Sequence, residues 1–231
     1  MPTVLITGAS RGIGLELARQ YAADSWNVIA TVRDSRDGAK LAAFGSNVAV
    51  YVAEVTDHQS LVRLAADLKG APVDVLICNA GILGPLEVEF GKTDYAVWED
   101  MFRVNVMGVM ATAEALIENV AASALKSIVI ISSGAGSLTQ SDRPFATRST
   151  FLYRLTKAAL NSVMRSISVL VKERGVIAVS MTPGWTRTDM GGPDAPLSAQ
   201  DPVSGMRKVI AGLTPAHSGH FYRHTGEEVP W

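Results

Sequence analysis

The sequence predicts an α/β protein built on one doubly wound parallel sheet, with helices on both faces. Two observations support this prediction. Short apolar runs alternate along the chain with longer amphipathic stretches, and a glycine-rich turn directly follows the first apolar run. Strands that alternate with helices favour a parallel sheet with right-handed crossovers. The 231 residues suffice for one full core and show no linker or repeat, so we expect residues 1–231 to form a single domain.

The first strand and the turn after it carry a functional signal. Residues 3–7 form an apolar run that is typical of a strand buried on both faces, and Gly8, Gly12 and Gly14 follow it. Glycines at a strand-to-helix turn let the backbone approach a pyrophosphate, which the helix N-terminus then stabilises. The spacing is Gly-x-x-x-Gly-x-Gly, and a lone glycine cluster is more often a simple turn. Its position after the first strand favours a Rossmann-type dinucleotide site.

Residues 27–32 form the second expected strand, and Arg33 stands at its end. An acid at this point binds a free ribose 2′-hydroxyl, whereas Arg accepts a 2′-phosphate. Arg11 in the glycine turn could reach the same phosphate, and guanidinium groups suit phosphates well. Asp34 is expected to face solvent. The residues therefore favour NADP over NAD, with two solvated surface arginines as the alternative interpretation.

The remaining elements continue the alternation. We expect strands at 47–52, 73–78, 126–131 and 176–181, and helices at 36–44, after 57, over 93–120 and over 151–171. Asn105 is a polar break in an apolar stretch and is by default a satisfied core amide. Ser133 follows the fifth strand and is by default a turn former. Ligands of such sheets, however, bind at the carboxyl ends of the strands.

Tyr153 and Lys157 begin the helical pattern of residues 151–171. Residues at i and i+4 lie on the same side of a helix, so the phenol and the ammonium group project together. A nearby ammonium group favours the phenolate, so we expect Lys157 to lower the tyrosine pKa from about 10 and to make Tyr153 a general acid/base. On its own, Tyr-x-x-x-Lys usually marks a solvated helix face.

Together these motifs resemble those of the short-chain dehydrogenase/reductase family, in its order and over nearly the whole chain. The matching pieces are residues 7–14, 79–81, Asn105, Ser133, Tyr153 with Lys157, and Pro183-Gly184. Residues 153–161, 183–192 and 226–231 are similar, more narrowly, to the C-factor/sniffer-type carbonyl reductase branch.

The resemblance implies an NADPH-dependent oxidoreductase that reduces an aldehyde or ketone to an alcohol. Tyr153 would donate the proton, and Ser133 would orient the carbonyl oxygen. Lys157 would hold the nicotinamide ribose, and Asn105 would position a water that relays protons to Lys157. The cofactor supplies the hydride, and the protein supplies positioning and an acid.

The resemblance also implies the residues that hold the cofactor, with no metal in the site. Residues of the glycine turn would hold the phosphates and the adenosine ribose, whereas Pro183, Gly184 and Thr188 would border the nicotinamide. The full expected set is Gly8, Ser10, Arg11, Gly12, Ile13, Gly14, Arg33, Glu54, Val55, Asn79, Ala80, Gly81, Tyr153, Lys157, Pro183, Gly184, Thr186 and Thr188.

The sequence departs from the family pattern at three places. Glu54 stands where an Asp often contacts the adenine, which keeps the acceptor but adds a methylene. Cys78 stands where a second Asn is common, and we interpret it as a buried filler. The stretch 134–150 makes the interval between the expected serine and tyrosine unusually long. We expect it to form a loop at the mouth of the pocket, and Ser132 or Ser137 could then be the catalytic hydroxyl instead.

Composition excludes several other classes. A net charge of −1 gives no reason to expect nucleic acid or an anionic membrane as partner. No apolar run approaches the roughly 20 residues that span a bilayer. The one cysteine cannot form an internal disulfide, so we expect a soluble, cytoplasmic protein. His217, His220 and His224 are expected to be surface or loop residues rather than a metal site.

Several questions stay open at the level of sequence. The alternatives to a carbonyl reductase are a 3-oxoacyl-carrier-protein reductase and a nucleotide-binding signalling protein with little turnover. The apolar faces of 94–120 and 151–171 suggest a homo-oligomer, a dimer or a tetramer, and Trp231 is expected to pack on the domain or on a partner subunit. A mild preference for aromatic or aliphatic carbonyls rests on Phe145, Phe151, Trp185 and Met190.

Overall fold

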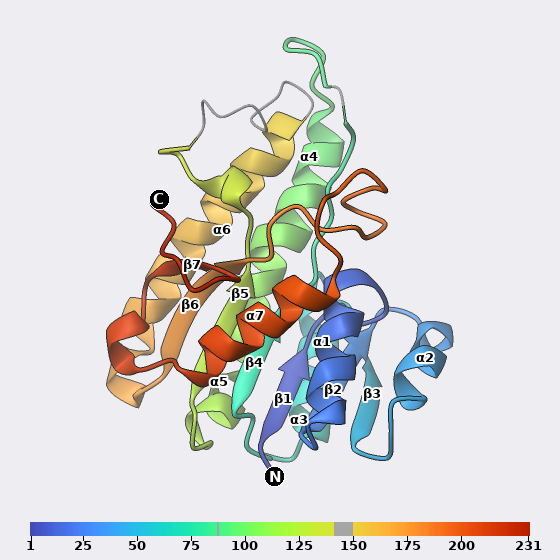
Figure 1. The fold of residues 1–231 in the computed structure, drawn as a ribbon, viewed down its shortest axis with the longest axis vertical. Coiled ribbons are helices and arrows are strands. Elements are labelled where there is room, and N and C mark those ends of the chain that lie inside the picture. The colour runs from blue at the N-terminus through green and yellow to red at the C-terminus, as the bar shows by residue number, and fades with distance from the viewer. Residues whose placement is uncertain (87, 141–149) are drawn as a thin grey trace.

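The computed structural model describes residues 1–86, 88–140 and 150–231 (Figure 1). Its centre is a seven-stranded sheet in the order β3-β2-β1-β4-β5-β6-β7, in which every neighbouring pair is parallel. The strands are β1 (Thr3–Ile6), β2 (Asn27–Val32), β3 (Val48–Val52), β4 (Val75–Cys78), β5 (Ser127–Ile131), β6 (Ile177–Thr182) and β7 (Phe221–Arg223). The predicted doubly wound sheet is therefore confirmed.

Helices cover both faces of the sheet (Figure 1). They are α1 (Gly12–Ala23), α2 (Ala39–Ala42), α3 (His58–Asp67), α4 (Tyr95–Phe102), α5 (Gly108–Ala121), α6 (Phe151–Leu170) and α7 (Gln200–Ala211). The alternation of side chains along β1 shows how the two faces divide. Ile6 packs in one core with Leu17 of α1, whereas Leu5 packs in the other with Leu116 of α5 and Leu160 of α6. Each fully buried leucine contributes roughly 1.5–3 kcal/mol to folding.

Two predicted helices were wrong in their extent. The expected helix at 36–44 is a 3₁₀ turn, Ser35–Gly38, followed by the short α2, because the Asp34 carboxylate accepts the Arg36 amide at 2.9 Å and caps a tighter turn. The expected helix at 93–120 is divided by one turn of π-helix, Arg103–Met107, between α4 and α5.

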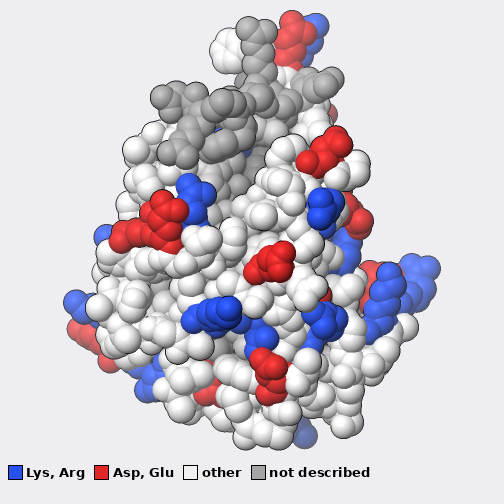
Figure 2. All heavy atoms as spheres, in the orientation of Figure 1, with Lys and Arg blue, Asp and Glu red and all other residues white. Residues whose placement is uncertain are grey.

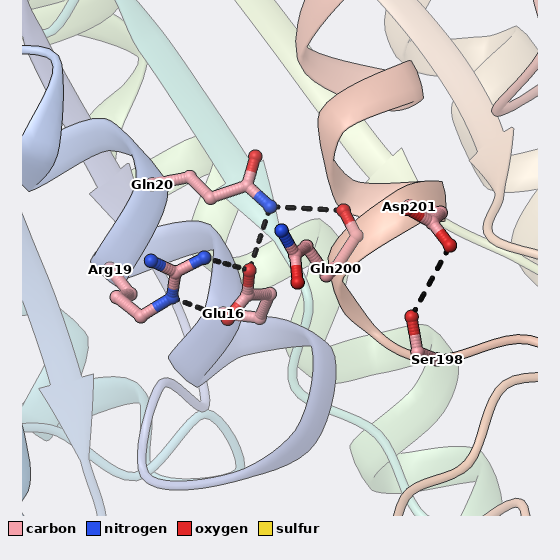
Figure 3. A network of polar contacts seen from close by, with 6 residues as sticks. All are labelled: Glu16, Arg19, Gln20, Ser198, Gln200 and Asp201. Carbon is pink, nitrogen blue, oxygen red and sulfur yellow. Dashed lines mark hydrogen bonds and ion pairs between the residues drawn. The ribbon is translucent and has the colours of Figure 1, made fainter.

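Helices α1 and α7 are joined by polar contacts at their surface (Figure 3). The Gln20 side chain donates to the backbone oxygen of Gln200 at 3.0 Å and to the Glu16 carboxylate at 2.7 Å. Arg19 donates to the same carboxylate at 2.6 and 2.8 Å and holds the pKa of Glu16 below its usual value. The N-terminus of α7 is thereby tied to the helix that follows the glycine turn.

The surface carries mixed charge. On the face that Figure 2 shows, basic and acidic side chains of the described residues are interspersed. Within the described part of the chain, no helix combines the length and the apolar character that crossing a membrane requires.

Candidate active site

The residues predicted for the site follow the strands at one edge of the sheet. Gly8 comes after β1, Asn79 after β4, Ser133 after β5 and Pro183 after β6. Strands β1 and β4 are neighbours, and the chain continues from β1 towards β2 on one side and from β4 towards β5 on the other. Ligands of open α/β sheets bind at such a reversal of strand order, outside the carboxyl ends.

The glycine turn (residues 8–14) is too tight for side chains at two positions. Gly8 has a φ of +65°, and a Cβ there would lie 2.9 Å from the Cα of Ala80. A Cβ on Gly14 would lie 2.4 Å from the Gly8 oxygen and 2.5 Å from Nδ2 of Asn79. The backbone of this turn therefore stays bare at the start of α1, where a pyrophosphate could approach the amides.

Asn79 fixes the shape of the glycine turn. Its Nδ2 donates to the backbone oxygens of Thr7 and Gly8, both at 3.0 Å. The Thr7 hydroxyl in turn accepts the backbone N–H groups of Asn79 at 3.1 Å and Ala80 at 3.2 Å. The sequence placed Thr7 in the motif without a role, and the structure assigns it the tie between β1 and β4.

Two exposed arginines stand near the expected position of the adenosine ribose. Arg33 follows β2, whose Thr31 oxygen accepts the backbone N–H of Ala9 in the glycine turn at 2.9 Å. Arg11 is 67% exposed and lies 3.4 Å from the Asp189 carboxylate. The Asp34 side chain is exposed to solvent as expected, and Arg36 binds its carboxylate there and lowers its pKa. The Asp34 carboxylate is thereby paired with Arg36. Arg33 is exposed, and Arg11 would have to exchange its exposed pair with Asp189 for an anion of the cofactor.

The turn after β3 also lies at this edge. The Glu54 carboxylate accepts the backbone N–H of Thr56 at 3.1 Å, so it caps its own turn. Val55 is buried against α5, where a Cβ on Gly108 would lie 2.9 Å from a Val55 methyl group. The missing side chain of Gly108 therefore allows a close approach between α5 and this turn.

Asn105 lies in the π-helix and is fully buried. Its Oδ1 accepts the Ile82 amide and its Nδ2 donates to the Ile82 oxygen, both at 2.8 Å. Nδ2 also contacts the Thr156 hydroxyl of α6 at 3.1 Å. A Cβ on Gly81 would lie 3.2 Å from Asn105 Oδ1 and 3.8 Å from Lys157 Nζ. The bulge thus brings Asn105, Gly81 and Lys157 together, in keeping with the frequent occurrence of π-bulges at functional sites.

Ser133, Tyr153 and Lys157 converge between β5 and α6. The Ser133 hydroxyl is hydrogen-bonded to the Tyr153 phenol. Lys157 Nζ donates to the Ile131 oxygen at 3.0 Å and lies 5.6 Å from the centroid of the Tyr153 ring. Ser132 and Ser137, the alternative hydroxyls, bind Asn161 at 2.7 Å and the Pro230 oxygen at 2.5 Å respectively. Ser133 is therefore the one of the three that engages the phenol.

The expected depression of the Tyr153 pKa by Lys157 is wrong. Burial raises the pKa of Tyr153 to about 12, against the smaller opposing effect of the Ser133 hydrogen bond. Burial also lowers the pKa of Lys157 to about 8. The ammonium group is directed to the β5 carbonyl rather than to the phenol oxygen, so desolvation of both groups outweighs their attraction.

The loop after β6 (residues 183–199, the β6 loop) reaches back to the glycine turn. Gly184 has a φ of +77°, and the Thr186 hydroxyl turns inward to the Gly184 oxygen at 3.3 Å. Thr188 accepts the Gly191 amide at 3.1 Å, and its methyl group would lie 3.3 Å from a Cβ on Gly12. The β6 loop therefore joins the nicotinamide side expected at β6 to the phosphate side at α1.

The residues suggested for the substrate side are placed only in part. Trp185 and Met190 are exposed on the β6 loop, and Phe151 opens α6. Phe145 and the other residues of 141–149, among them Asp142, Arg143 and Arg148, lie outside the described residues. Residues 134–140 are described, and they include the single 3₁₀ turn Gly134–Gly136.

The residues that the sequence set aside also have definite places. His220 pairs with Glu228 at 2.7 Å, and within the described residues no three potential metal ligands gather. Cys78 is buried at the end of β4, and burial raises the pKa of its thiol to about 12. Trp231 stacks on Phe221 of β7 with 5.7 Å between the ring centroids.

Asn161 is a site-supporting residue that the sequence did not assign. It lies on α6 one turn after Lys157, is buried, and contacts three separate segments. Its signal in the sequence is a polar residue on the apolar face of the helix at i+4 from the lysine.

Comparison with known proteins agrees with this geometry. The model of the short chain dehydrogenase family matches residues 2–196. The C-signal protein of Myxococcus xanthus is 42% identical over 167 residues, which cover 72% of this chain and 98% of that protein. Among solved structures, the NADPH-bound carbonyl reductase from chicken fatty liver superposes with a TM-score of 0.91 at 31% identity, covering 100% of this chain and 99% of that one.

A second solved structure, the carbonyl reductase Sniffer of D. melanogaster, gives a TM-score of 0.89 at 26% identity and covers both chains completely. The resemblance to the C-factor/sniffer-type branch is therefore confirmed. The chain belongs to the short-chain dehydrogenase/reductase family.

Proposed function

We propose that this protein is an NADPH-dependent carbonyl reductase that converts an aldehyde or ketone to an alcohol. The observation that carries the proposal is the convergence of the Ser133 hydroxyl, the Tyr153 phenol and the buried Lys157 ammonium group beside the strand ends. The comparison structures support it, since one is a carbonyl reductase with NADPH bound and another a carbonyl reductase.

The residues present fit such a cofactor. The bare backbone of the glycine turn would accept the pyrophosphate at the N-terminus of α1, and the exposed Arg11 and Arg33 would bind the 2′-phosphate. Lys157 would hold the nicotinamide ribose, and the Pro183-Gly184 segment would border the ring. When bound, NADPH supplies the hydride to the carbonyl carbon.

The chain's own residues would manage the proton. Ser133 would donate a hydrogen bond to the carbonyl oxygen and orient it, and Tyr153 would transfer its phenolic proton to the same oxygen. The phenolate that this transfer leaves is costly in a buried site, as the raised pKa of Tyr153 indicates. The Lys157 ammonium group would stabilise it, and Asn105 would connect Lys157 to a relay of water for reprotonation.

A matched pair of variants tests the proposal. We expect wild-type protein to oxidise NADPH with members of an aldehyde and ketone panel, and Tyr153→Phe to lose roughly 10²–10⁴-fold in kcat, because it lacks the proton donor. Tryptophan fluorescence should show NADPH binding unchanged in this variant. Tyr95→Phe, at a tyrosine 72% exposed on α4, is the control and should keep full activity.

Cofactor choice is tested separately. We expect NADPH to bind more tightly than NADH, and Arg33→Ala to abolish most of the difference. Equal affinity of the wild-type protein for both cofactors would contradict the assignment of the arginines and leave the reductase itself in place. No binding of either cofactor would overturn the proposed function.

One observation favours a second candidate, a nucleotide-binding signalling protein with little turnover. It is the 42% identity to the protein named C-signal. Tight NADPH binding without turnover of any carbonyl in the panel would select this candidate.

We further propose that the protein is a homo-oligomer. Tyr95, Phe102 and Met107 are exposed around a groove on the outer side of α4 and the π-helix, and a second copy would cover this apolar surface. A sedimentation experiment that shows only monomer at micromolar concentration would refute this.

A further inference from the structure

The hydroxyl of Ser133 is held by a compact segment, residues 133–137, which we call the serine turn. The Ser133 side chain accepts the Ala135 amide at 3.1 Å, and the Ser133 oxygen accepts the Gly136 amide at 2.9 Å. The Ser137 amide closes the turn on the Gly134 oxygen at 3.1 Å. Because these bonds tie the serine turn together along its length and two of them end on Ser133, a displacement at its far end moves the reactive hydroxyl.

Asn161 holds that far end. Its Nδ2 donates to the Gly136 oxygen at 3.3 Å, and the side chain is only 3% exposed. Its Oδ1 accepts two buried hydroxyls, Ser132 of the β5 end at 2.7 Å and Ser180 of β6 at 3.2 Å. One amide thus joins the serine turn, two strands of the sheet and α6.

The serine turn packs tightly against α6 at Gly136. A Cβ on Gly136 would lie 2.7 Å from the backbone carbon and oxygen of Lys157, so the turn rests directly on the helix. Tyr153, Lys157 and Asn161 follow one another at i, i+4 and i+8 on α6, on one side of the helix. The distance from Ser133 to the phenol is therefore set by the seating of Gly136 between Lys157 and Asn161.

We propose that Asn161 is a positioning residue for the reductase reaction, which fixes the Ser133 hydroxyl relative to Tyr153 and Lys157 through the Gly136 carbonyl. The inference rests on the proposed function. Asn161 would touch neither substrate nor cofactor. Its role is geometric, and a reacting group misplaced by about 1 Å can cost on the order of a hundredfold in rate.

Asn161→Asp is the sharpest variant, since it keeps the size of the side chain and an acceptor for both serine hydroxyls. It replaces the Nδ2 donor by an oxygen that repels the Gly136 oxygen. We expect kcat to fall about 10- to 100-fold, while KM for the carbonyl and the Kd for NADPH stay within twofold. The matched control is Ser180→Ala, which removes one hydroxyl from the same amide oxygen but keeps the Gly136 bond and should keep kcat.

A readout that needs no turnover is hydrogen–deuterium exchange of the cofactor-free protein. We expect Asn161→Asp to speed exchange of the serine-turn amides, and β4 and β6 to keep their protection. If Asn161→Asp does not fold, Gly136→Ala tests the same seating from the other side, with the same expected loss of kcat. Wild-type kcat and exchange in either folded variant would overturn the proposal. A wild-type protein without any turnover would overturn the proposed function instead, and exchange would still decide the role of Asn161.

Discussion

At the scale of single residues, Lys157 is the most costly group in the site. Lys157 is only 4% exposed, so its ammonium group loses most of its hydration, and the hydrogen bond to the Ile131 oxygen replaces only part of that loss. Burial accordingly lowers the pKa of Lys157 from 10.5 to about 8. The ammonium group lowers the stability of the fold and lies 5.6 Å from the centroid of the Tyr153 ring. A functional role best explains why such a costly group is buried there.

We expect Lys157→Met to abolish turnover and to stabilise the protein at neutral pH. The gain is at most roughly 3–4 kcal/mol, because the pKa of Lys157 falls from 10.5 to about 8 and each pKa unit corresponds to about 1.4 kcal/mol. Urea unfolding of both proteins at pH 7 measures it. If Lys157→Met is less stable than the wild type, the contacts of the buried ammonium group compensate fully for its lost hydration.

The same residue gives a pH dependence of known sign. Between pH 8 and 10.5 the unfolded chain binds a proton at Lys157 that the folded chain has lost, so wild-type stability should rise with pH there. Above about pH 10 the raised pKa values of Tyr21 and Tyr153 act in the opposite direction. Those tyrosines are also present in Lys157→Met, so subtracting its profile isolates the rise. If the stability of wild type and Lys157→Met changes with pH in the same way, a lowered pKa of Lys157 does not destabilise the folded protein.

At the scale of elements, α1 depends on the absence of one side chain. The helix begins at Gly12, and Gly14 lies against the Gly8 carbonyl and the Asn79 amide. This close approach allows Asn79 to bond the oxygens of both Thr7 and Gly8. The first turn of the helix, the glycine turn and the end of β4 are therefore one packed unit.

We expect Gly14→Ala to prevent cofactor binding and to lower stability by about 1–3 kcal/mol, because its Cβ would push backbone and buried amide apart. NADPH titration and thermal unfolding measure the two effects. Gly212→Ala, after α7, is the control, since its Cβ would meet nothing closer than 3.6 Å. If both variants bind NADPH and unfold alike, the close packing around Gly14 is not what requires a glycine there.

The elements also show how far sequence reasoning reaches. Strands β1 and β4 were predictable because their apolar runs are buried on both faces and have no polar alternation. Strand β7 was not predicted, since its three residues give no period, and α7 was hidden by Pro202 and Gly205. The only sign of the π-helix in the sequence is Asn105, a polar residue in an apolar stretch.

In the candidate site, the sequence predicted the chemical groups but not the residues that support them. Tyr153 and Lys157 stand four residues apart, and Ser133 follows a strand that was predictable. Thr7 and Asn161 act through backbone oxygens and amides of segments far away in the chain, and no local pattern records such contacts. The direction of the Tyr153 pKa likewise depends on burial, which only the packed structure supplies.

At the scale of the whole molecule, distant parts of the chain meet at the serine turn. The Ser137 hydroxyl donates to the Pro230 oxygen, and Thr139 donates its backbone N–H to the Trp231 oxygen at 2.9 Å. Trp231 itself is anchored on Phe221 of β7. The segment after β5 is thereby held from α6 on one side and from the region of β7 on the other.

Cys78 provides a test of how firmly these parts hold together. It is the one cysteine of the chain, and it lies buried at the end of β4 beside the Asn79 network. A thiol reagent can reach it only when the centre of the sheet opens. NADPH at 100 times its Kd should stabilise the closed form by about 2.7 kcal/mol and slow labelling about a hundredfold. Labelling that is fast and indifferent to NADPH would mean that the centre opens without releasing the cofactor.

Because Cys78 is buried at the centre of the sheet, its rate of labelling can report ligand binding. An aromatic disulfide that releases a coloured product would report, at a single internal point, each opening of the sheet between the glycine turn and β5. Compounds could then be ranked as ligands by how far they delay the colour, before any substrate of the enzyme is known. A buried sulfur atom with no part in the chemistry thus offers a route to the physiological substrate.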